Sequence, residues 1–97
     1  MSTQQFIDKP LVWFDGEYTG LNISKDRVLE YAVIITDSDL NVVDTLGPIV
    51  LHQSDELLAT MDEWCTRTHT DSGLVAKVKE SSVTEGEAQT LPLRFHL

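Results

Sequence analysis

Three apolar runs, each rich in strand-forming residues, fill the first half of the chain, and polar residues separate them. They predict a buried strand over residues 11–15, a second over residues 28–36, and a third from near Asn41 to Leu51. Gly47-Pro48 interrupts the third run and predicts a bend or a bulge. Because the connections are short and polar, we expect an antiparallel meander. The unbroken apolar residues 32–35 predict a second strand covered on both faces.

Helix signals appear only in the second half of the chain. Ser54 is suited to cap a helix over residues 55–61, which has acidic residues in its first turn. A second short helix is predicted over residues 74–79, after Gly73. Thr84 and Glu87 have the spacing of a capping box for a third helix, which Pro92 would interrupt. The pattern therefore predicts an α/β fold in which helices pack on a sheet.

An acidic pair stands directly after the first apolar run. In an extended backbone, Asp15 and Glu17 project to the same side, whereas Gly16 points away. Neighbouring carboxylates repel each other unless a cation lies between them, and hard divalent ions prefer oxygen ligands. A metal site is one interpretation. The other is that Asp15-Gly16 starts a hairpin and that both acids are solvated. Thr19-Gly20 then predicts a turn, in which glycine is free to adopt a positive φ.

Charge and composition narrow the classes of partner. Sixteen acidic and seven basic residues give a formal net charge of −9. This charge opposes tight binding of long nucleic acid, but not of a short oligonucleotide held through metal ions. The 97 residues suffice for one small domain. Cys65 is the single cysteine, and we expect it to pack rather than to act as a nucleophile. The sequence shows no apolar leader and no membrane span, which predicts a cytosolic protein.

The residues around the acidic pair resemble those of a known family. Asp15-x-Glu17-x-Thr19-Gly20-Leu21, after an apolar strand, is similar to the first motif of exonucleases whose active site combines four acidic residues and a histidine. More narrowly, the chain resembles oligoribonucleases over about residues 10–91. Further strings that carry the resemblance are Arg27-Val28-Leu29-Glu30, Ile34-Ile35-Thr36-Asp37-Ser38-Asp39-Leu40-Asn41, His52-Gln53-Ser54-Asp55-Glu56-Leu57-Leu58, Met61-Asp62-Glu63-Trp64-Cys65 and Ser72-Gly73-Leu74.

The resemblance implies a fold, a function and a set of site residues. It implies the first half of a ribonuclease H-like fold and a homodimeric 3′-to-5′ exoribonuclease that degrades short RNA oligonucleotides by two-metal-ion hydrolysis. Asp15 and Glu17 would ligate Mg²⁺ or Mn²⁺. Leu21 would wedge against the nucleobases, and Trp64 would stack on the terminal base. Core packing is the alternative for Trp64, and Trp13 is expected in the core.

Some positions depart from the family pattern or have two interpretations. Gly16 stands where the family usually has Leu, which removes a side chain opposite the acidic pair. Tyr18 stands where the family usually has Met, and neither change removes a metal ligand. Glu30 is expected either to support the acidic site from the second strand or to make a structural hydrogen bond.

The later motifs of the family have no counterpart in this sequence. The family uses a general-base histidine that is followed five residues later by an aspartate. None of the three histidines, His52, His69 and His96, fits this motif. His69 is nevertheless a candidate for a substrate contact near Trp64. The aspartate of the second motif is also absent. We therefore expect a lead-in over residues 1–9, a truncated exonuclease domain over residues 10–91 and a divergent tail over residues 92–97, with apolar surface and a strand edge left uncovered.

Two other functions fit the same residues. One is a catalytically inactive fragment or isoform that acts as an interaction or regulatory module. The other is a small acidic metal-binding domain that uses Asp15 and Glu17. For a full-length member of the family, mitochondria are a second compartment besides the cytosol.

Overall fold

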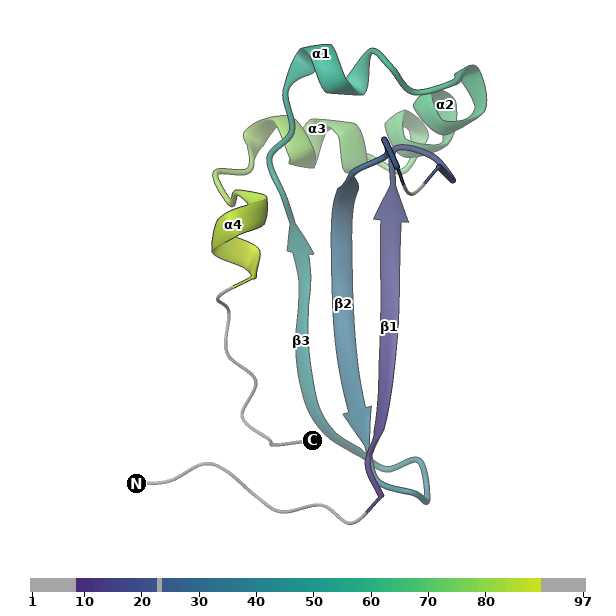
Figure 1. Cartoon of the computed structure of the whole chain (residues 1–97), viewed down its shortest axis with the longest axis vertical. Coiled ribbons are helices and arrows are strands. Elements are labelled where there is room, and N and C mark those ends of the chain that lie inside the picture. The colour runs from purple at the N-terminus through teal and green to yellow at the C-terminus, as the bar shows by residue number, and fades with distance from the viewer. Residues whose placement is uncertain (1–8, 23, 90–97) are drawn as a thin grey trace.

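The computed structural model describes residues 9–22 and 24–89, and it shows an α/β arrangement in which strands precede helices (Figure 1). The predicted lead-in therefore lies outside the described residues apart from Lys9, as does the whole predicted tail. The elements are β1 (Leu11–Tyr18), β2 (Val28–Thr36), β3 (Val42–Val50), α1 (Asp55–Leu58), α2 (Glu63–Asp71), α3 (Leu74–Glu80) and α4 (Glu85–Ala88).

The three strands form the predicted antiparallel meander, in the order β1-β2-β3. β1 is longer than its apolar run, because its pairing with β2 continues through the acidic pair as far as Tyr18. Asp15 and Gly16 are therefore inside a strand, and the alternative that they start a hairpin is wrong. The pairing becomes irregular only between Glu17 and Tyr18, where the strand ends.

The predicted bend in the third strand is present at Gly47-Pro48. The register between β2 and β3 shifts between Tyr31 and Val33, opposite this position. Gly47 has a φ of 92°, and a Cβ there would lie 2.7 Å from the backbone oxygen of Tyr31. Glycine is therefore required by both the backbone conformation and the close approach of β2.

The helices differ in detail from the predicted ones. α1 ends at Leu58 rather than at residue 61, although the Ser54 hydroxyl caps it by accepting a hydrogen bond from the Leu57 N–H (3.1 Å). α3 is one residue longer than predicted. α4 has the complete capping box formed by Thr84 and Glu87. α2 was not predicted as a helix. No helix in the described part of the chain has both the length and the apolar character needed to cross a membrane.

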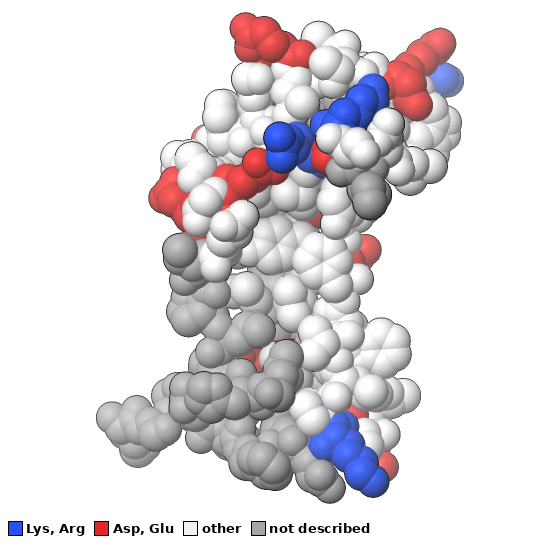
Figure 2. Space-filling model, viewed as in Figure 1, with Lys and Arg blue, Asp and Glu red and all other residues white. Residues whose placement is uncertain are grey.

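The helices gather at one end of the sheet, where they form the core (Figure 1). The buried cluster joins β2 to α1 and α3 and consists of Leu29, Leu58, Leu74 and Val78, with Val50, Met61 and Val75 partly buried against it. Charged side chains gather at this same end, whereas the middle of the viewed sheet face is mostly uncharged (Figure 2). The cluster thus ties α1 and α3 to β2.

β1 is an edge strand of the described sheet, and the prediction that it is buried is wrong. Its apolar side chains are exposed because only β2 flanks it among the described strands. Trp13 is 50% exposed rather than in the core, and its indole N–H donates to the Thr36 hydroxyl (3.1 Å). β2 is likewise not covered on both faces along its whole length, since Ile35 is fully buried but Ile34 is exposed. The expected uncovered strand edge and apolar surface are therefore observed.

Candidate functional site

The acidic pair lies on one face of β1, near the helical end of the sheet. Asp15 pairs with Ala32 across the β1–β2 ladder, and Glu17 pairs with Glu30. Since directly paired residues share a face, Glu17 and Glu30 are like charges in adjacent positions, an arrangement that is destabilising in the absence of a cation. Among the described residues, no hydrogen bond or ion pair occupies the carboxylates of these three acids.

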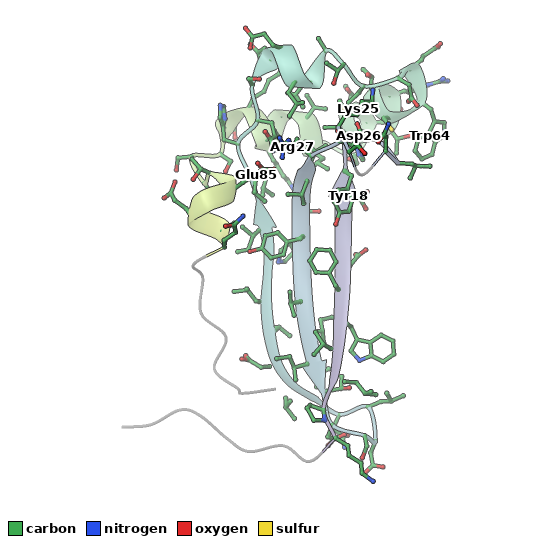
Figure 3. The ribbon with its side chains drawn as sticks, viewed as in Figure 1. Tyr18, Lys25, Asp26, Arg27, Trp64 and Glu85 are labelled. Carbon is green, nitrogen blue, oxygen red and sulfur yellow. The ribbon has the colours of Figure 1, made fainter. Side chains whose placement is uncertain are left out.

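Three of the residues predicted for the site line one hollow. Glu17, Leu21 and Trp64 come from β1, the loop after it and α2, and they border a cavity of about 420 Å³. Trp64 is 66% exposed, and Leu21 is fully exposed. The indole of Trp64 projects from α2 away from the sheet (Figure 3). The alternative that Trp64 belongs to the core is therefore wrong. Asp15 lies further along β1 and does not line this hollow.

The position of Trp64 depends on α2, whose first turn is well capped. A carboxylate oxygen of Asp62 accepts a hydrogen bond from the Cys65 N–H (2.7 Å). Arg67 and Glu63 form an exposed ion pair one turn apart (3.6 Å). The one sequence signal that could have predicted this helix is its cap residue, Asp62. The segment after Asp62 is mostly polar and has little apolar periodicity, so the hydrophobic pattern does not predict a helix there.

Cys65 faces inward from the same helix. It is buried, and burial, assisted by the neighbouring Asp62 carboxylate, raises the pKa of its thiol. A thiol with a raised pKa is a poor nucleophile at neutral pH, because the thiolate is the reactive form. This environment agrees with a packing role for Cys65.

Asp26 organises the loop between β1 and β2. The Thr19 hydroxyl donates to one carboxylate oxygen of Asp26 (2.9 Å), and the Asn22 N–H donates to the other (2.8 Å). The Asn22 hydrogen bond is the main cause, and the Thr19 hydrogen bond a further cause, of the lowered pKa of Asp26. Thr19 in turn accepts from the Arg27 N–H (3.0 Å). These bonds fix the loop that carries Leu21.

Gly20 fits this loop for a reason that differs from the predicted one. Its φ is not in the positive range, unlike those of Gly47 and Gly73. A Cβ at Gly20 would instead lie 2.5 Å from a carboxylate oxygen of Asp26. The glycine is therefore needed for the close approach of Asp26. Asp26 was not a candidate at the level of sequence, because its partners Thr19 and Asn22 are several residues away.

The histidines have structural contacts in the described part of the chain. Nε2 of His69 lies 2.9 Å from the backbone oxygen of Tyr18, and the imidazole is buried. The contact ties α2 to the end of β1, and His69 also borders the hollow that contains Glu17 and Trp64. Nδ1 of His52 lies 3.2 Å from the backbone oxygen of Val78. His96 lies outside the described residues.

The donor set fits a divalent metal ion in part. Asp15 and Glu17 supply oxygen ligands on one face, the kind that Mg²⁺ and Mn²⁺ prefer. Within the described ranges, however, no group of three or more His, Cys, Asp or Glu side chains is placed to hold a metal ion. Two carboxylates leave most positions of an octahedral ion to water or to other groups. The chain can therefore contribute to a metal site without completing its coordination.

Gly16 shows how the face opposite the acids is arranged. A Cβ at Gly16 would lie 2.9 Å from a ring carbon of Phe14 and 2.9 Å from a ring carbon of Tyr18. The two aromatic rings thus occupy the space beside the glycine, where the family usually has a leucine side chain. This face is separate from the acidic pair because strand side chains alternate.

Comparison with known proteins gives consistent matches over most of the chain. The model of the exonuclease family (RNase T) matches residues 12–93. An oligoribonuclease of Marinobacter nauticus is 53% identical over 85 residues, which are 88% of this chain and 47% of that protein. An oligoribonuclease of Photorhabdus laumondii is 49% identical over the same length, with the same coverage. An oligoribonuclease of Vibrio cholerae is 49% identical over 90 residues, which are 93% of this chain and 50% of that protein.

The chain thus spans about half the length of the curated relatives it matches. Its meander and the helices after it are consistent with the first half of a ribonuclease H-like exonuclease fold. The matched residues include the acidic pair, the loop after it and the helix that carries Trp64. The chain belongs to the exonuclease family.

Proposed function

We propose that this chain supplies the acidic pair and the base-binding surface of a 3′-to-5′ exoribonuclease that degrades short RNA oligonucleotides. The observation that supports the proposal most is the hollow shared by Glu17, Leu21 and Trp64. It places a carboxylate, an exposed apolar side chain and an exposed indole around one space of about 420 Å³. The relatives that resemble the chain are named oligoribonucleases.

The proposed binding of substrate follows from the exposed apolar groups. Stacking of a nucleobase on an aromatic side chain contributes about 1–3 kcal/mol and tolerates any base. Trp64 would carry this stacking, and Leu21 would restrict the base from the other side of the hollow. The net charge of −9 disfavours long nucleic acid, because there are few cations to neutralise its phosphates. The site is therefore suited to short oligonucleotides.

The proposed chemistry needs divalent ions, which supply a nucleophilic water and charge stabilisation in two-metal phosphodiester hydrolysis. Asp15 and Glu17 would hold Mg²⁺ or Mn²⁺ through their unoccupied carboxylate oxygens. Glu30 would support this site, since it lies opposite Glu17 in the ladder. We further propose that residues 10–91 form the exonuclease unit, that it works as a homodimer, and that it does so in the cytosol.

The test is hydrolysis of a labelled diribonucleotide by the purified chain with Mn²⁺. We expect product from the unchanged chain, loss of product for Asp15→Asn, and weaker substrate binding for Trp64→Ala. Trp13→Ala is the matched control, because Trp13 is also an exposed indole but lies outside the hollow. Equal binding by the two tryptophan variants would contradict the assignment of Trp64.

A second function is a cation-binding or interaction module without turnover. The specific observation in its favour is that the described residues supply fewer than three clustered metal ligands. It predicts that the chain binds Mn²⁺, that Asp15→Asn weakens this binding, and that no mononucleotide is released. Calorimetric titration with Mn²⁺ beside the hydrolysis assay separates the two functions.

A further inference from the structure

A second, smaller hollow lies beside the acidic pair, between the strands and the helices that follow them. Its volume is about 210 Å³. Glu17 and Glu30 line it from β1 and β2, and Lys77 lines it from α3. The other residues around it come from α2, from the residue that ends α2 and from α3; they are Thr68, His69, Ser72 and Leu74. A lysine thus borders the same space as two carboxylates that are paired across the strands.

The packing of α3 fixes the position of Lys77. Leu74 and Val78 of this helix are buried with Leu29 of β2 in the core cluster. Lys77 lies three residues after Leu74, so the two side chains share one side of the helix, and both border the hollow. Lys77 itself is exposed, and its flexible four-carbon stem can turn. The ammonium group is therefore kept beside the acidic face without being locked into one contact.

Two of the other polar side chains in this hollow have partners elsewhere. Nε2 of His69 lies 2.9 Å from the backbone oxygen of Tyr18. The Ser72 hydroxyl donates to the backbone oxygen of His69 (3.2 Å) and accepts from the Leu74 N–H (3.3 Å). The two carboxylates have no hydrogen bond or ion pair with any described residue. A cation that borders the hollow is thus the group best suited to balance their charge.

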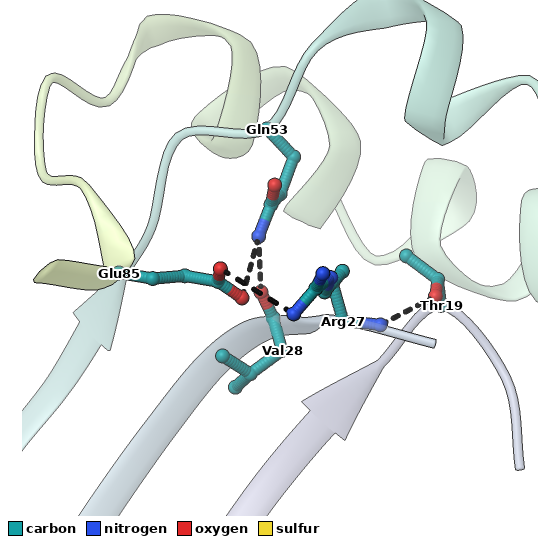
Figure 4. A network of polar contacts seen from close by, with 5 residues as sticks. All are labelled: Thr19, Arg27, Val28, Gln53 and Glu85. Carbon is teal, nitrogen blue, oxygen red and sulfur yellow. Dashed lines mark hydrogen bonds and ion pairs between the residues drawn. The ribbon is translucent and has the colours of Figure 1, made fainter. Parts of the chain in front are cut away.

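Lys77 is available for this role. Three other basic residues of the described chain already form ion pairs, at 3.6 to 4.0 Å: Arg67 with Glu63, Lys79 with Asp55, and Arg27 with Glu85. The last pair belongs to a network with Gln53, whose side-chain nitrogen lies 3.4 Å from a Glu85 carboxylate oxygen (Figure 4). Lys77 forms no ion pair with a described residue. Its charge is therefore available to the two carboxylates in the hollow.

We propose that Lys77 is a positioning residue, an internal counter-cation for Glu17 and Glu30 that limits the affinity of the acidic pair for divalent ions. Without a metal ion, its ammonium group offsets part of the repulsion between the two carboxylates. When Glu17 holds a divalent ion, the ammonium group is repelled and turns outward to solvent. The effect on metal affinity rests on the proposed metal-binding role of the acidic pair, whereas the effect on the metal-free chain does not.

A double-mutant cycle in metal-free buffer tests the counter-cation. Glu30→Gln should lower the equilibrium constant of unfolding in both the unchanged chain and Lys77→Met. We expect the decrease to be about two- to fivefold larger in Lys77→Met, because no attraction to lysine is lost there. The difference should shrink in about 1 M salt, which screens exposed charges. Urea denaturation measures both effects.

The matched control for the cycle is Lys79→Met. Lys79 lies in the same helix, but its ammonium group faces Asp55. Glu30→Gln should therefore have the same effect in Lys79→Met as in the unchanged chain. Equal effects in all three backgrounds would overturn the proposal, as would a difference that does not respond to salt.

Calorimetric titration with Mn²⁺ tests the effect on metal affinity. Lys77→Met should bind Mn²⁺ roughly three- to tenfold more tightly than the unchanged chain, since a positive charge near the ion is removed. Lys77→Arg keeps the charge and should restore the original affinity, which a purely structural role of the lysine stem would not explain. Lys79→Met should also leave the affinity unchanged. Equal affinities of Lys77→Met and Lys79→Met would overturn the proposed limit on metal binding.

The two tests separate this inference from the proposed function. Mn²⁺ binding that is lost in Asp15→Asn but unaffected by Lys77→Met would support the proposed function and overturn the inference. If no variant bound Mn²⁺, the proposed metal site would be wrong, and the effect of Lys77 on metal affinity with it. The metal-free cycle would still decide whether Lys77 balances the two carboxylates.

Discussion

Glu17 and Glu30 are direct cross-strand partners on one face of the sheet. Opposed like charges in an antiparallel pair cost roughly 0.2–1 kcal/mol. In the absence of metal, Glu30→Gln should therefore raise the free energy of unfolding by up to about 1 kcal/mol, as measured by urea denaturation. Asp39→Asn is the control, because it removes the same charge from an exposed turn. A stability gain no larger than that of the control would show that Glu17 and Glu30 do not repel each other.

Gly20 should be intolerant of a side chain. A Cβ would lie 2.5 Å from the Asp26 carboxylate, and this carboxylate is held by hydrogen bonds from Thr19 and Asn22. We expect Gly20→Ala to lower the free energy of unfolding by about 1–3 kcal/mol, as overpacking does elsewhere. The measurement is the urea midpoint.

The matched control is Gly86→Ala in α4, where a Cβ would lie 3.9 Å from the Thr84 hydroxyl oxygen. Replacing a helical glycine by alanine should raise stability by roughly 0.5–1 kcal/mol. If the two substitutions change the free energy of unfolding in the same way, the loop accommodates a side chain at Gly20, and Asp26 does not fix its conformation.

Stability should fall at acidic pH in part through Asp26. Its pKa is lowered in the folded chain, first by the Asn22 N–H and also by the Thr19 hydroxyl. The stabilisation is therefore present above the unfolded pKa of about 3.9 and is lost as the pH falls through the lower, folded pKa. Asp26→Asn should be less stable near neutral pH and should show a flatter stability profile below about pH 4.

Urea denaturation across this range measures that profile. Asp37 provides an internal comparison, since its pKa is also lowered, chiefly by the Asn41 side chain. Asp37→Asn should also flatten the profile of stability against pH in the acidic range, because it removes a carboxylate from a different loop. If neither variant changes the profile, other groups cause the acid sensitivity.

Cys65 should react slowly with thiol reagents in the folded chain. Burial is the main cause of its raised pKa, and the Asp62 carboxylate adds to it. Urea should accelerate the reaction greatly, because it exposes the thiol and restores an ordinary pKa. Asp62→Asn should increase the rate in the folded chain, whereas Glu63→Gln, one residue further on, should not. A fast reaction without denaturant would show that Cys65 is accessible.

The sequence predicted the meander well because alternation and turn residues are local signals. The β2 bounds, the bend at Gly47 and the capping box at Thr84 all follow from neighbouring residues. The end of β1 was missed since the acidic residues interrupt its apolar run, although pairing with β2 keeps them extended. α2 was missed because its exposed surface leaves little apolar periodicity.

Burial was predicted less well, because it depends on which elements lie beside a strand. Trp13 reads as a core residue, yet it is half exposed on the edge strand. The site could be predicted as far as Glu17, Leu21 and Trp64, which line one hollow. Their dependence on Asp26 and His69 could not, since the Asp26 contact depends on how the loop after β1 folds and the His69 contact joins the end of β1 to α2.

The measurement that tests the metal-binding role of the acidic pair most directly is a Mn²⁺ titration of the isotope-labelled chain, followed by paramagnetic broadening of its amide resonances. We predict that broadening is centred on Asp15, Glu17 and Glu30, and that Asp15→Asn combined with Glu17→Gln abolishes it. Broadening that is centred on the Asp37–Asp39 turn, or that persists in the double variant, would contradict the account.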